Sequence, residues 1–282
     1  MSPARAHTLQ AALAAARLRI GAVDARVLLA ALTGRDAAYL IAHAAEEFAA
    51  EQALTYDRWV ARRAAGEPVA YIVGWREFYG RRFRVTADVL IPRPETELLV
   101  DVAVSALRGR DAPRVLDLGT GSGCIAITLA IECAGAHVTA VDASHAALEI
   151  AAANARELGA RVEWLHGDWL DAVAGRRFDL VVSNPPYIAG GDPHLGQGDL
   201  RFEPAMALTP GRDGLAAIRR IVADASACLA PAGSLWFEHG YEQGAASRAL
   251  LESGGYVAIE THRDLAGIER VTGGTLPAGS EG

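Results

Sequence analysis

Strand-like and helix-like patterns alternate through the second half of the chain, and this alternation narrows the possible folds most. Strands are expected near residues 114–118, 137–141, 161–165, 178–182, 234–238, 255–260 and 268–273. Helices are expected near residues 94–107, 123–133, 145–158, 213–229 and 242–253. Such alternation predicts an α/β fold, in which a mostly parallel sheet is covered by helices on both faces. The short connection between the last two strands predicts an antiparallel strand at one end.

A glycine-rich turn follows the first strand of this half. It consists of Gly119, Thr120, Gly121, Ser122 and Gly123. Glycine lets the backbone approach a ligand closely and adopt positive φ. The dinucleotide fingerprint has glycines at the first, third and sixth positions, whereas here they stand at the first, third and fifth. Asp117, inside the strand, suits a cationic amino acid better than a pyrophosphate. The turn is therefore similar to the S-adenosyl-L-methionine (SAM) loop of Rossmann-like methyltransferases, and a dinucleotide site is the alternative.

The second strand of this half ends at Asp142, 19 positions after Gly123. An acidic residue at this point can accept hydrogen bonds from both hydroxyls of a ribose. Asp is also common at strand ends and helix N-caps, so the residue alone is a weak signal. Its place after a strand, a glycine turn and a helix makes it a candidate for cofactor binding.

The tetrapeptide Asn184-Pro185-Pro186-Tyr187 follows an apolar run at 178–183. It is expected at the carboxyl end of a buried strand, where open α/β sheets bind ligands. Proline has no N–H, so this segment offers carbonyl acceptors that are not tied into a ladder. Together with the Asn carbonyl and the Tyr ring, they suit the planar NH₂ group of an amide or an amino-base. A plain turn is the alternative, because Asn and Pro are common turn residues.

Composition excludes several kinds of chemistry. All 27 basic residues are arginine, which excludes a P-loop lysine, a Schiff base and a lysine general base. The cysteines, at 124, 133 and 228, lack metal-ligand spacing, and no His/Cys cluster or Ser/His/Asp order points to a metal site or a hydrolase. The net charge of −7 argues against a large phosphate-binding face. No apolar segment is typical of a membrane span or a signal peptide, so a reduced, cytoplasmic protein is expected.

The chain is expected to divide into a helical region, a linker and a sheet-containing domain. Apolar residues recur at helical spacing in residues 1–68, and Asp36 is a candidate cap for a short helix there. Residues 69–92 are interpreted as a β-hairpin linker, in which Tyr71-Ile72-Val73 and Glu77-Phe78-Tyr79 flank glycines. The sheet domain then spans residues 93–276, and residues 277–282 form a tail.

Further stretches extend the pattern over nearly the whole chain. They are residues 66–72, 77–80, 91–97, 192–195, 198–204 and 269–271. With the glycine turn and the tetrapeptide, they resemble the bacterial peptide chain release factor N5-glutamine methyltransferases. The resemblance implies a Rossmann-like class I SAM-dependent methyltransferase with a seven-stranded sheet, a helical N-terminal docking domain and a hairpin linker. It also implies methyl transfer from SAM, giving S-adenosyl-L-homocysteine, to the glutamine side-chain nitrogen in a Gly-Gly-Gln loop of class 1 translation release factors.

The resemblance assigns roles to individual residues. Cofactor binding falls to Asp117, Gly119, Thr120, Gly121, Ser122, Gly123, Asp142, Asp168, Trp169 and Asn184. Among these, Asp168 would accept from the adenine amino group, and Trp169 would pack on the cofactor or, alternatively, in the core. Catalysis and substrate binding fall to Asn184, Pro185, Pro186 and Tyr187. Asn184 and the Pro185 carbonyl would accept both N–H bonds of the glutamine amide, and Tyr187 would pack on its plane.

Several neighbouring residues have open roles. Arg93 and Glu95 line the site or merely precede the domain. His194 and Arg201 shape the substrate entrance or lie on a solvated loop. Glu238-His239, at the end of a strand, is interpreted as structural.

Three other functions are alternatives. An adenine-N6 DNA methyltransferase could use the same tetrapeptide on a flipped base. It needs a basic cleft, whereas residues 91–282 carry a net charge of −10, so direct nucleic-acid binding is not expected. A ribosomal-protein glutamine methyltransferase would share the catalytic motifs and differ in its N-terminal domain. A SAM-binding scaffold would bind the cofactor without turnover. Residues 1–90 carry a net charge of +3, which could help to hold an acidic release factor.

Overall fold

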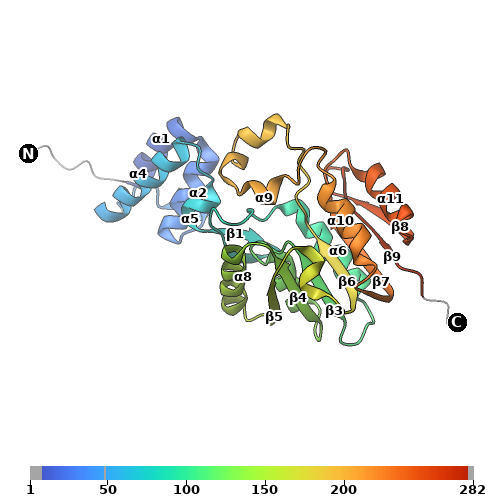
Figure 1. Cartoon of the computed structure of the whole chain (residues 1–282). Coiled ribbons are helices and arrows are strands. Elements are labelled where there is room, and N and C mark those ends of the chain that lie inside the picture. Colours follow the sequence, from blue (N-terminus) through green and yellow to red (C-terminus); the bar gives the residue numbers. More distant parts are fainter. Residues whose placement is uncertain (1–7, 48, 279–282) are drawn as a thin grey trace, which may run out of the picture. The chain divides into compact units, whose positions relative to one another are not determined.

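The chain divides into two compact units, Met1–Trp75 and Arg76–Gly282, and their helices and strands are drawn in Figure 1. Among the described residues, each unit has a hydrophobic core of its own. The computed structural model describes residues 8–47 and 49–278. The expected tail beyond residue 278 and the first seven residues of the expected helical domain therefore lie outside the described residues. In the described part, no helix has the length and apolar character needed to cross a membrane.

The first unit is helical. Its helices are α1 (Leu9–Ile20), α2 (Ala22–Thr33), α3 (Ala37–Ala42), α4 (Ala50–Ala64) and α5 (Val69–Val73). Asp36 caps α3 as expected, since its side chain accepts from the Tyr39 N–H at 2.7 Å. Leu28, Leu29 and Tyr56 are fully buried in the core, and the Tyr56 hydroxyl donates to the carbonyl of Ala25 at 2.8 Å. The sequence pattern thus gave the right class of structure for this region.

The hairpin is shorter than expected, with strands β1 (Trp75–Phe78) and β2 (Arg81–Arg84). The interpretation of Tyr71-Ile72-Val73 as part of the hairpin linker is wrong, because these residues belong to helix α5. The Pro68 carbonyl accepts from the N–H groups of residues 71 and 72, and Gly74 ends the helix at φ 84°. A proline start and a left-handed glycine stop thus override the β-branched pattern.

The second unit contains the expected seven-stranded sheet, in the order β5-β4-β3-β6-β7-β9-β8. Its strands are β3 (Arg114–Leu118), β4 (His137–Asp142), β5 (Val162–His166), β6 (Phe178–Ser183), β7 (Leu229–Glu238), β8 (Val257–Arg263) and β9 (Glu269–Thr275). Strands β3 to β7 pair in parallel, whereas β9 runs antiparallel to both β7 and β8. The expected antiparallel strand is therefore confirmed, but it is not the edge strand, because β9 lies between β7 and the edge strand β8.

Helices cover both faces of the sheet. They are α6 (Glu97–Ala106), α7 (Cys124–Glu132), α8 (His145–Leu158), α10 (Ala216–Ala225) and α11 (Gly244–Ser253). Leu180 and Val182 of β6 pack in one hydrophobic cluster with α6 and α7, while Val181 packs in another with α10 and α11. Alternate side chains of one strand thus enter opposite layers, as a sheet covered on both sides requires.

Helix α10 is shorter than expected, because the chain joins the sheet early. The alanine-rich segment up to residue 229 predicts a continuing helix, but α10 ends at Ala225. Leu229 already pairs with Phe178, whose N–H donates to the Cys228 carbonyl at 2.8 Å. Sheet pairing therefore overrides the local helix propensity.

Candidate functional site

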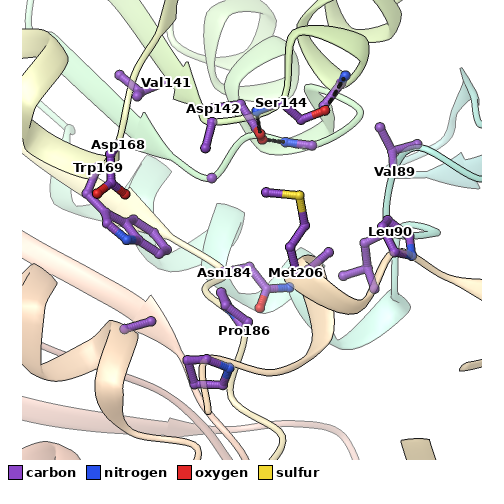
Figure 2. A pocket seen from close by; sticks show the side chains of 18 of the residues that line it. Val89, Leu90, Val141, Asp142, Ser144, Asp168, Trp169, Asn184, Pro186 and Met206 are labelled. Atoms are coloured by element: carbon purple, nitrogen blue, oxygen red, sulfur yellow. Dashed lines mark hydrogen bonds between the residues drawn. The ribbon is translucent and has the colours of Figure 1, made fainter. Parts of the chain in front are cut away.

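A cavity of about 430 Å³ opens at the carboxyl edge of the parallel strands (Figure 2). Strands β4, β3 and β6 lie side by side there, and strand order reverses between β3 and β6. This reversal is where doubly wound sheets bind ligands. The volume is within the usual range for small-molecule sites, about 300–1,000 Å³. The lining includes Asp88, Val89, Leu90, Gly119, Gly121, Asp142, Ser144, Asp168, Trp169, Asn184, Pro186, Met206 and Arg220.

The glycine turn and Asp142 form one wall of the cavity. The two carboxylate oxygens of Asp142 accept from the backbone N–H groups of Gly121 at 2.8 Å and Ser144 at 2.9 Å (Figure 2). Each oxygen keeps a further lone pair. Asp142 therefore both shapes the turn and offers acceptors to a ligand's hydroxyl groups.

Only part of the predicted turn faces the cavity. Gly119 and Gly121 line it, whereas Thr120 and Ser122 are buried beside it. Gly123, at φ 81°, lies against the packed side chains of helices α7 and α8 and strand β5. The glycines thus serve two purposes, close approach at the cavity and close packing behind it.

Asn154 of α8 fastens the turn from behind. Its side chain donates to the Ser122 carbonyl at 2.8 Å. The same carboxamide accepts from the Arg84 N–H at 2.8 Å and donates to the Arg84 carbonyl at 3.1 Å. One buried amide therefore joins the hairpin to the glycine turn, a role that no local sequence pattern indicated.

Asp117 lies fully buried under the turn and does not line the cavity. Its Oδ2 accepts from the Thr120 hydroxyl at 2.6 Å, while Oδ1 has no hydrogen-bond partner among the described residues. Burial raises the pKa of this carboxyl to about 7, against the lowering effect of the Thr120 hydroxyl. A positive charge on a ligand at the turn would favour the ionised form.

This pKa predicts a pH-dependent free energy of unfolding. The pKa rises from 3.8 in the unfolded chain to about 7 in the folded one, so between these values the folded state binds more protons. The contribution of Asp117 to stability is therefore greatest below pH 4 and falls as pH rises to about 7, by on the order of 4 kcal/mol in total. Urea unfolding at several pH values should show that Asp117→Asn lacks this component.

Glu203 and Glu238 also have raised pKa values through burial, but both groups remain in the Asp117→Asn variant. The difference between variant and wild type therefore isolates Asp117. Parallel stability profiles for the two proteins from pH 4 to pH 7 would contradict the assignment.

Trp169 and Asp168 line the cavity next to the glycine turn. Trp169 has φ 52°, an uncommon left-handed conformation for a non-glycine residue, and its ring lies in the wall near Gly119 (Figure 2). Asp168 lines the same part of the cavity, where its carboxylate pairs with Arg220 of α10 at 2.5 Å. Arg220 also pairs with Asp171 at 3.2 Å. The predicted adenine-side carboxylate is thus held in a surface ion-pair network that the sequence did not indicate.

The tetrapeptide lies where expected, at the end of β6. Asn184 and Pro186 line the cavity (Figure 2), whereas Pro185 is buried and Tyr187 is not among the lining residues. Asn184 donates through Nδ2 to the Thr96 hydroxyl oxygen at 3.0 Å. Its Oδ1 therefore stays available to a ligand in the cavity.

Tyr187 anchors the segment to the end of β7. Its hydroxyl donates to Glu238 Oε1 at 3.0 Å, and its carbonyl accepts from the Gln243 side chain at 2.9 Å. Burial and the adjacent Glu238 carboxylate raise the pKa of the phenol. Tyr187 therefore remains a neutral donor at any physiological pH.

A loop after the tetrapeptide covers the remaining side of the cavity. It contains three short helical turns, η3 (Pro193–Gly196), η4 (Leu200–Phe202) and α9 (Ala205–Leu208). Met206 of α9 projects between Asp142 and Asn184 (Figure 2) and is 58% exposed. Glu203 is buried, pairs with Arg93 and accepts from the Ile91 N–H at 3.0 Å. These two contacts fix the loop to the segment that precedes α6.

The four residues whose roles the sequence left open differ in their positions relative to the cavity. Arg93 supports the site through Glu203, while Glu95 is exposed. His194 is exposed and lies 2.7 Å from Asp192, and the Arg201 guanidinium lies over the Phe202 ring at 4.9 Å. Neither His194 nor Arg201 lines the cavity.

Comparison with known proteins identifies the kind of enzyme. Residues 95–203 match the family model "Methyltransferase small domain", and residues 7–74 match "PrmC N-terminal domain". A release factor glutamine methyltransferase from Bordetella pertussis is 53% identical over 90% of this chain and 94% of its own. One from Burkholderia pseudomallei is 54% identical over 92% and 93%. The chain belongs to the release factor glutamine methyltransferase family. The site above is thus that of a methyltransferase.

A solved structure supports the fold of this methyltransferase. The T. thermophilus 16S rRNA N2 G1207 methyltransferase, in complex with AdoMet and guanosine, matches with a TM-score of 0.52 at 23% identity. The match covers 72% of this chain and 49% of that one. The predicted Rossmann-like class I methyltransferase fold of this chain is therefore confirmed.

Proposed function

We propose that this methyltransferase binds SAM in the cavity and methylates the side-chain nitrogen of the Gly-Gly-Gln glutamine in class 1 release factors. The two relatives carry release factor glutamine methyltransferase as their name, and each matches over at least 90% of this chain. The observation that carries the chemical part is the Asn184 carboxamide. It lines the cavity and donates a hydrogen bond from Nδ2 to Thr96, so its carbonyl oxygen Oδ1 is available as an acceptor.

The cavity residues fit SAM in chemical type. Asp142 offers acceptors for the ribose hydroxyls, and Trp169 offers a flat apolar wall. Asp117 supplies negative charge beneath the turn, where a cationic amino group is favoured, and its Oδ1 has no partner among the described residues. Asp168 lies at the Trp169 end and keeps acceptor capacity beyond its pair with Arg220. When bound, SAM supplies a methyl group activated by its sulfonium.

The protein's own contribution is mainly positioning. An amide nitrogen is a weak nucleophile because its lone pair is delocalised into the carbonyl. In the proposal, Asn184 Oδ1 and the Pro185 carbonyl accept the two N–H bonds of the glutamine amide and hold the nitrogen in line with the donor side of the cavity. Orientation of this kind contributes roughly 7–11 kcal/mol in favourable systems. After transfer the nitrogen releases one proton and the neutral amide is restored, so no covalent intermediate on the enzyme is needed.

Tyr187 supports the tetrapeptide from outside the cavity. Its hydroxyl is committed to Glu238 and its carbonyl to Gln243, so the residue is held at both ends. Pro186, which lines the cavity, provides a rigid apolar contact beside the acceptor carbonyl. The tetrapeptide is thereby pre-organised before substrate enters.

Mass spectrometry with trideuteromethyl SAM tests this function directly. A class 1 release factor incubated with the enzyme should gain a single labelled methyl group on the Gly-Gly-Gln glutamine. A release factor with that glutamine replaced by alanine is the matched control and should stay unlabelled. Large-subunit ribosomal proteins and duplex DNA are offered in parallel. Label on either of these with none on the release factor would refute the proposed substrate.

A further inference from the structure

We propose that Met206 is a substrate-binding residue, whose side chain packs on the methylene groups of the acceptor glutamine while Asn184 holds the carboxamide. The inference rests on the proposed function and names the group that contacts the apolar part of the substrate side chain. Met206 lies in the loop after the tetrapeptide and belongs to neither the tetrapeptide nor the glycine turn.

Helix α9, which carries Met206, is held on both sides by hydrogen bonds. Before the helix, the buried side chain of Glu203 accepts from the Ile91 N–H at 3.0 Å. At its end, the carbonyl of the buried residue Leu208 accepts from the Ile188 N–H at 3.0 Å. Ile188 directly follows the tetrapeptide. The backbone that bears Met206 is therefore fixed relative to the proposed acceptor site.

The Met206 side chain extends from this fixed backbone into the cavity. It lines the cavity, projects between Asp142 and Asn184 (Figure 2), and is 58% exposed. Asp142 belongs to the proposed cofactor side and Asn184 to the proposed acceptor side. A methionine side chain is flexible and polarizable, so it can adapt its shape to a neighbouring apolar group. More than half of its surface is available for such a contact where the two sides meet.

The segments on this side of the cavity are mostly apolar. They contribute the lining residues Asp88, Val89, Leu90, Pro204, Met206, Ala207, Thr209 and Pro210. Only Asp88 and Thr209 among these are polar. Val89 and Leu90 directly precede Ile91, whose N–H is bound by Glu203. The same buried contact thus brings both apolar segments to one cavity.

A glutamine side chain needs two different surroundings in such a site. Its carboxamide needs hydrogen-bond partners, whereas its methylene groups gain free energy from contact with apolar surface. In the proposal, Asn184 provides the first and Met206 the second. The methylene groups are unchanged by methyl transfer, so this contact stabilises the bound substrate and the transition state equally. Its loss should therefore raise KM and leave kcat nearly unchanged.

Three substitutions of Met206 test the contact by kinetics with intact release factor. Met206→Ala removes the apolar surface, and Met206→Gln keeps the length of the side chain but makes its end polar. Both should raise KM for release factor roughly 3- to 15-fold, with kcat within about twofold of wild type. Met206→Leu keeps an apolar group of similar volume, so both constants should stay within about twofold.

Two further measurements on these variants exclude an indirect effect. The Tm should change little, because the Met206 side chain is 58% exposed. The calorimetric affinity for S-adenosyl-L-homocysteine should stay within about twofold of wild type, because Asp142, Trp169 and the glycine turn form the cofactor wall.

The methionine content allows the contact to be observed directly. The chain has two methionines, Met1 and Met206. Enzyme labelled with ¹³C-methyl methionine should therefore give an NMR resonance from the cavity that is missing in Met206→Leu. With S-adenosyl-L-homocysteine present, addition of release factor should shift this resonance. Release factor with alanine in place of the Gly-Gly-Gln glutamine is the matched control and should shift it much less.

Two results would overturn the inference. One is a KM within about twofold of wild type for both Met206→Ala and Met206→Gln. The other is an equal shift of the Met206 resonance with the glutamine and alanine forms of the release factor. The wild-type enzyme separates this inference from the proposed function. If it leaves the release factor unmethylated, the proposed function fails; if it methylates the factor and either result is found, only the role of Met206 is wrong.

Discussion

Replacement of Asn184 by alanine is expected to lower kcat by about 10²- to 10³-fold, the range found when a single pre-organised polar group is removed from an active site. The affinity for SAM should stay within a few-fold, because the cofactor wall is formed by the glycine turn, Asp142 and Trp169. Single-turnover methylation of release factor and calorimetric titration of S-adenosyl-L-homocysteine measure the two quantities separately.

Pro186→Ala is the matched control for this loss. Pro186 lines the same cavity but offers no side-chain hydrogen bond, so the variant should lose no more than several-fold in kcat. An Asn184→Ala enzyme with wild-type kcat, or with equal losses of turnover and cofactor affinity, would remove the acceptor role from the proposal.

Substitution of Gly123 by alanine should cause a large loss of stability. A Cβ atom there would lie 2.9 Å from Ile127 Cδ1, 3.0 Å from Ala151 Cβ and 3.1 Å from Trp164 Cη2, with φ at 81°. A left-handed conformation costs a residue other than glycine about 1–2 kcal/mol, and overpacking costs about 1–3 kcal/mol more. Chemical unfolding should therefore show a decrease of about 2–5 kcal/mol in the free energy of unfolding.

Gly135→Ala separates backbone strain from packing. Gly135 has φ 86° but no heavy atom within 4 Å of an added Cβ, so only the conformational cost of about 1–2 kcal/mol should remain. Equal losses at Gly123 and Gly135 would mean that the core around helix α7 accommodates the methyl group.

Most of the fold could be predicted from periodic apolar patterns and turn residues in the sequence. The alternation of apolar strands and helices predicted the parallel sheet because each pattern reflects burial on the faces of one element. The errors occurred where neighbours in space decided the conformation. Leu229 entered the sheet through pairing with Phe178, although its local sequence favoured helix. Tyr71 lies in helix α5, whose ends are set by Pro68 and Gly74, outside the apolar run that suggested a strand.

The site was predictable only for residues that follow strand ends. Asn184, Asp142 and the turn glycines reach the cavity because parallel strands place their carboxyl ends at one edge. Thr96 contacts Asn184 across 88 positions, and Arg220 contacts Asp168 across 52. Thr96 and Arg220 do not lie at strand ends, so no rule of sequence spacing could predict their contacts with Asn184 and Asp168. The Thr96 segment, residues 91–97, stood out as a motif in the sequence, but only the fold shows what its threonine touches.

The buried contact of Glu203 with Arg93 and the Ile91 N–H has a consequence for protein engineering. It makes two stretches 110 residues apart behave as a single exchangeable module. Consider a chimera that takes the loop around Glu203 from a distant homologue but keeps its own stretch around Arg93. Its buried carboxylate would lose a matched partner. Grafts intended to alter substrate choice therefore need both stretches from the same donor.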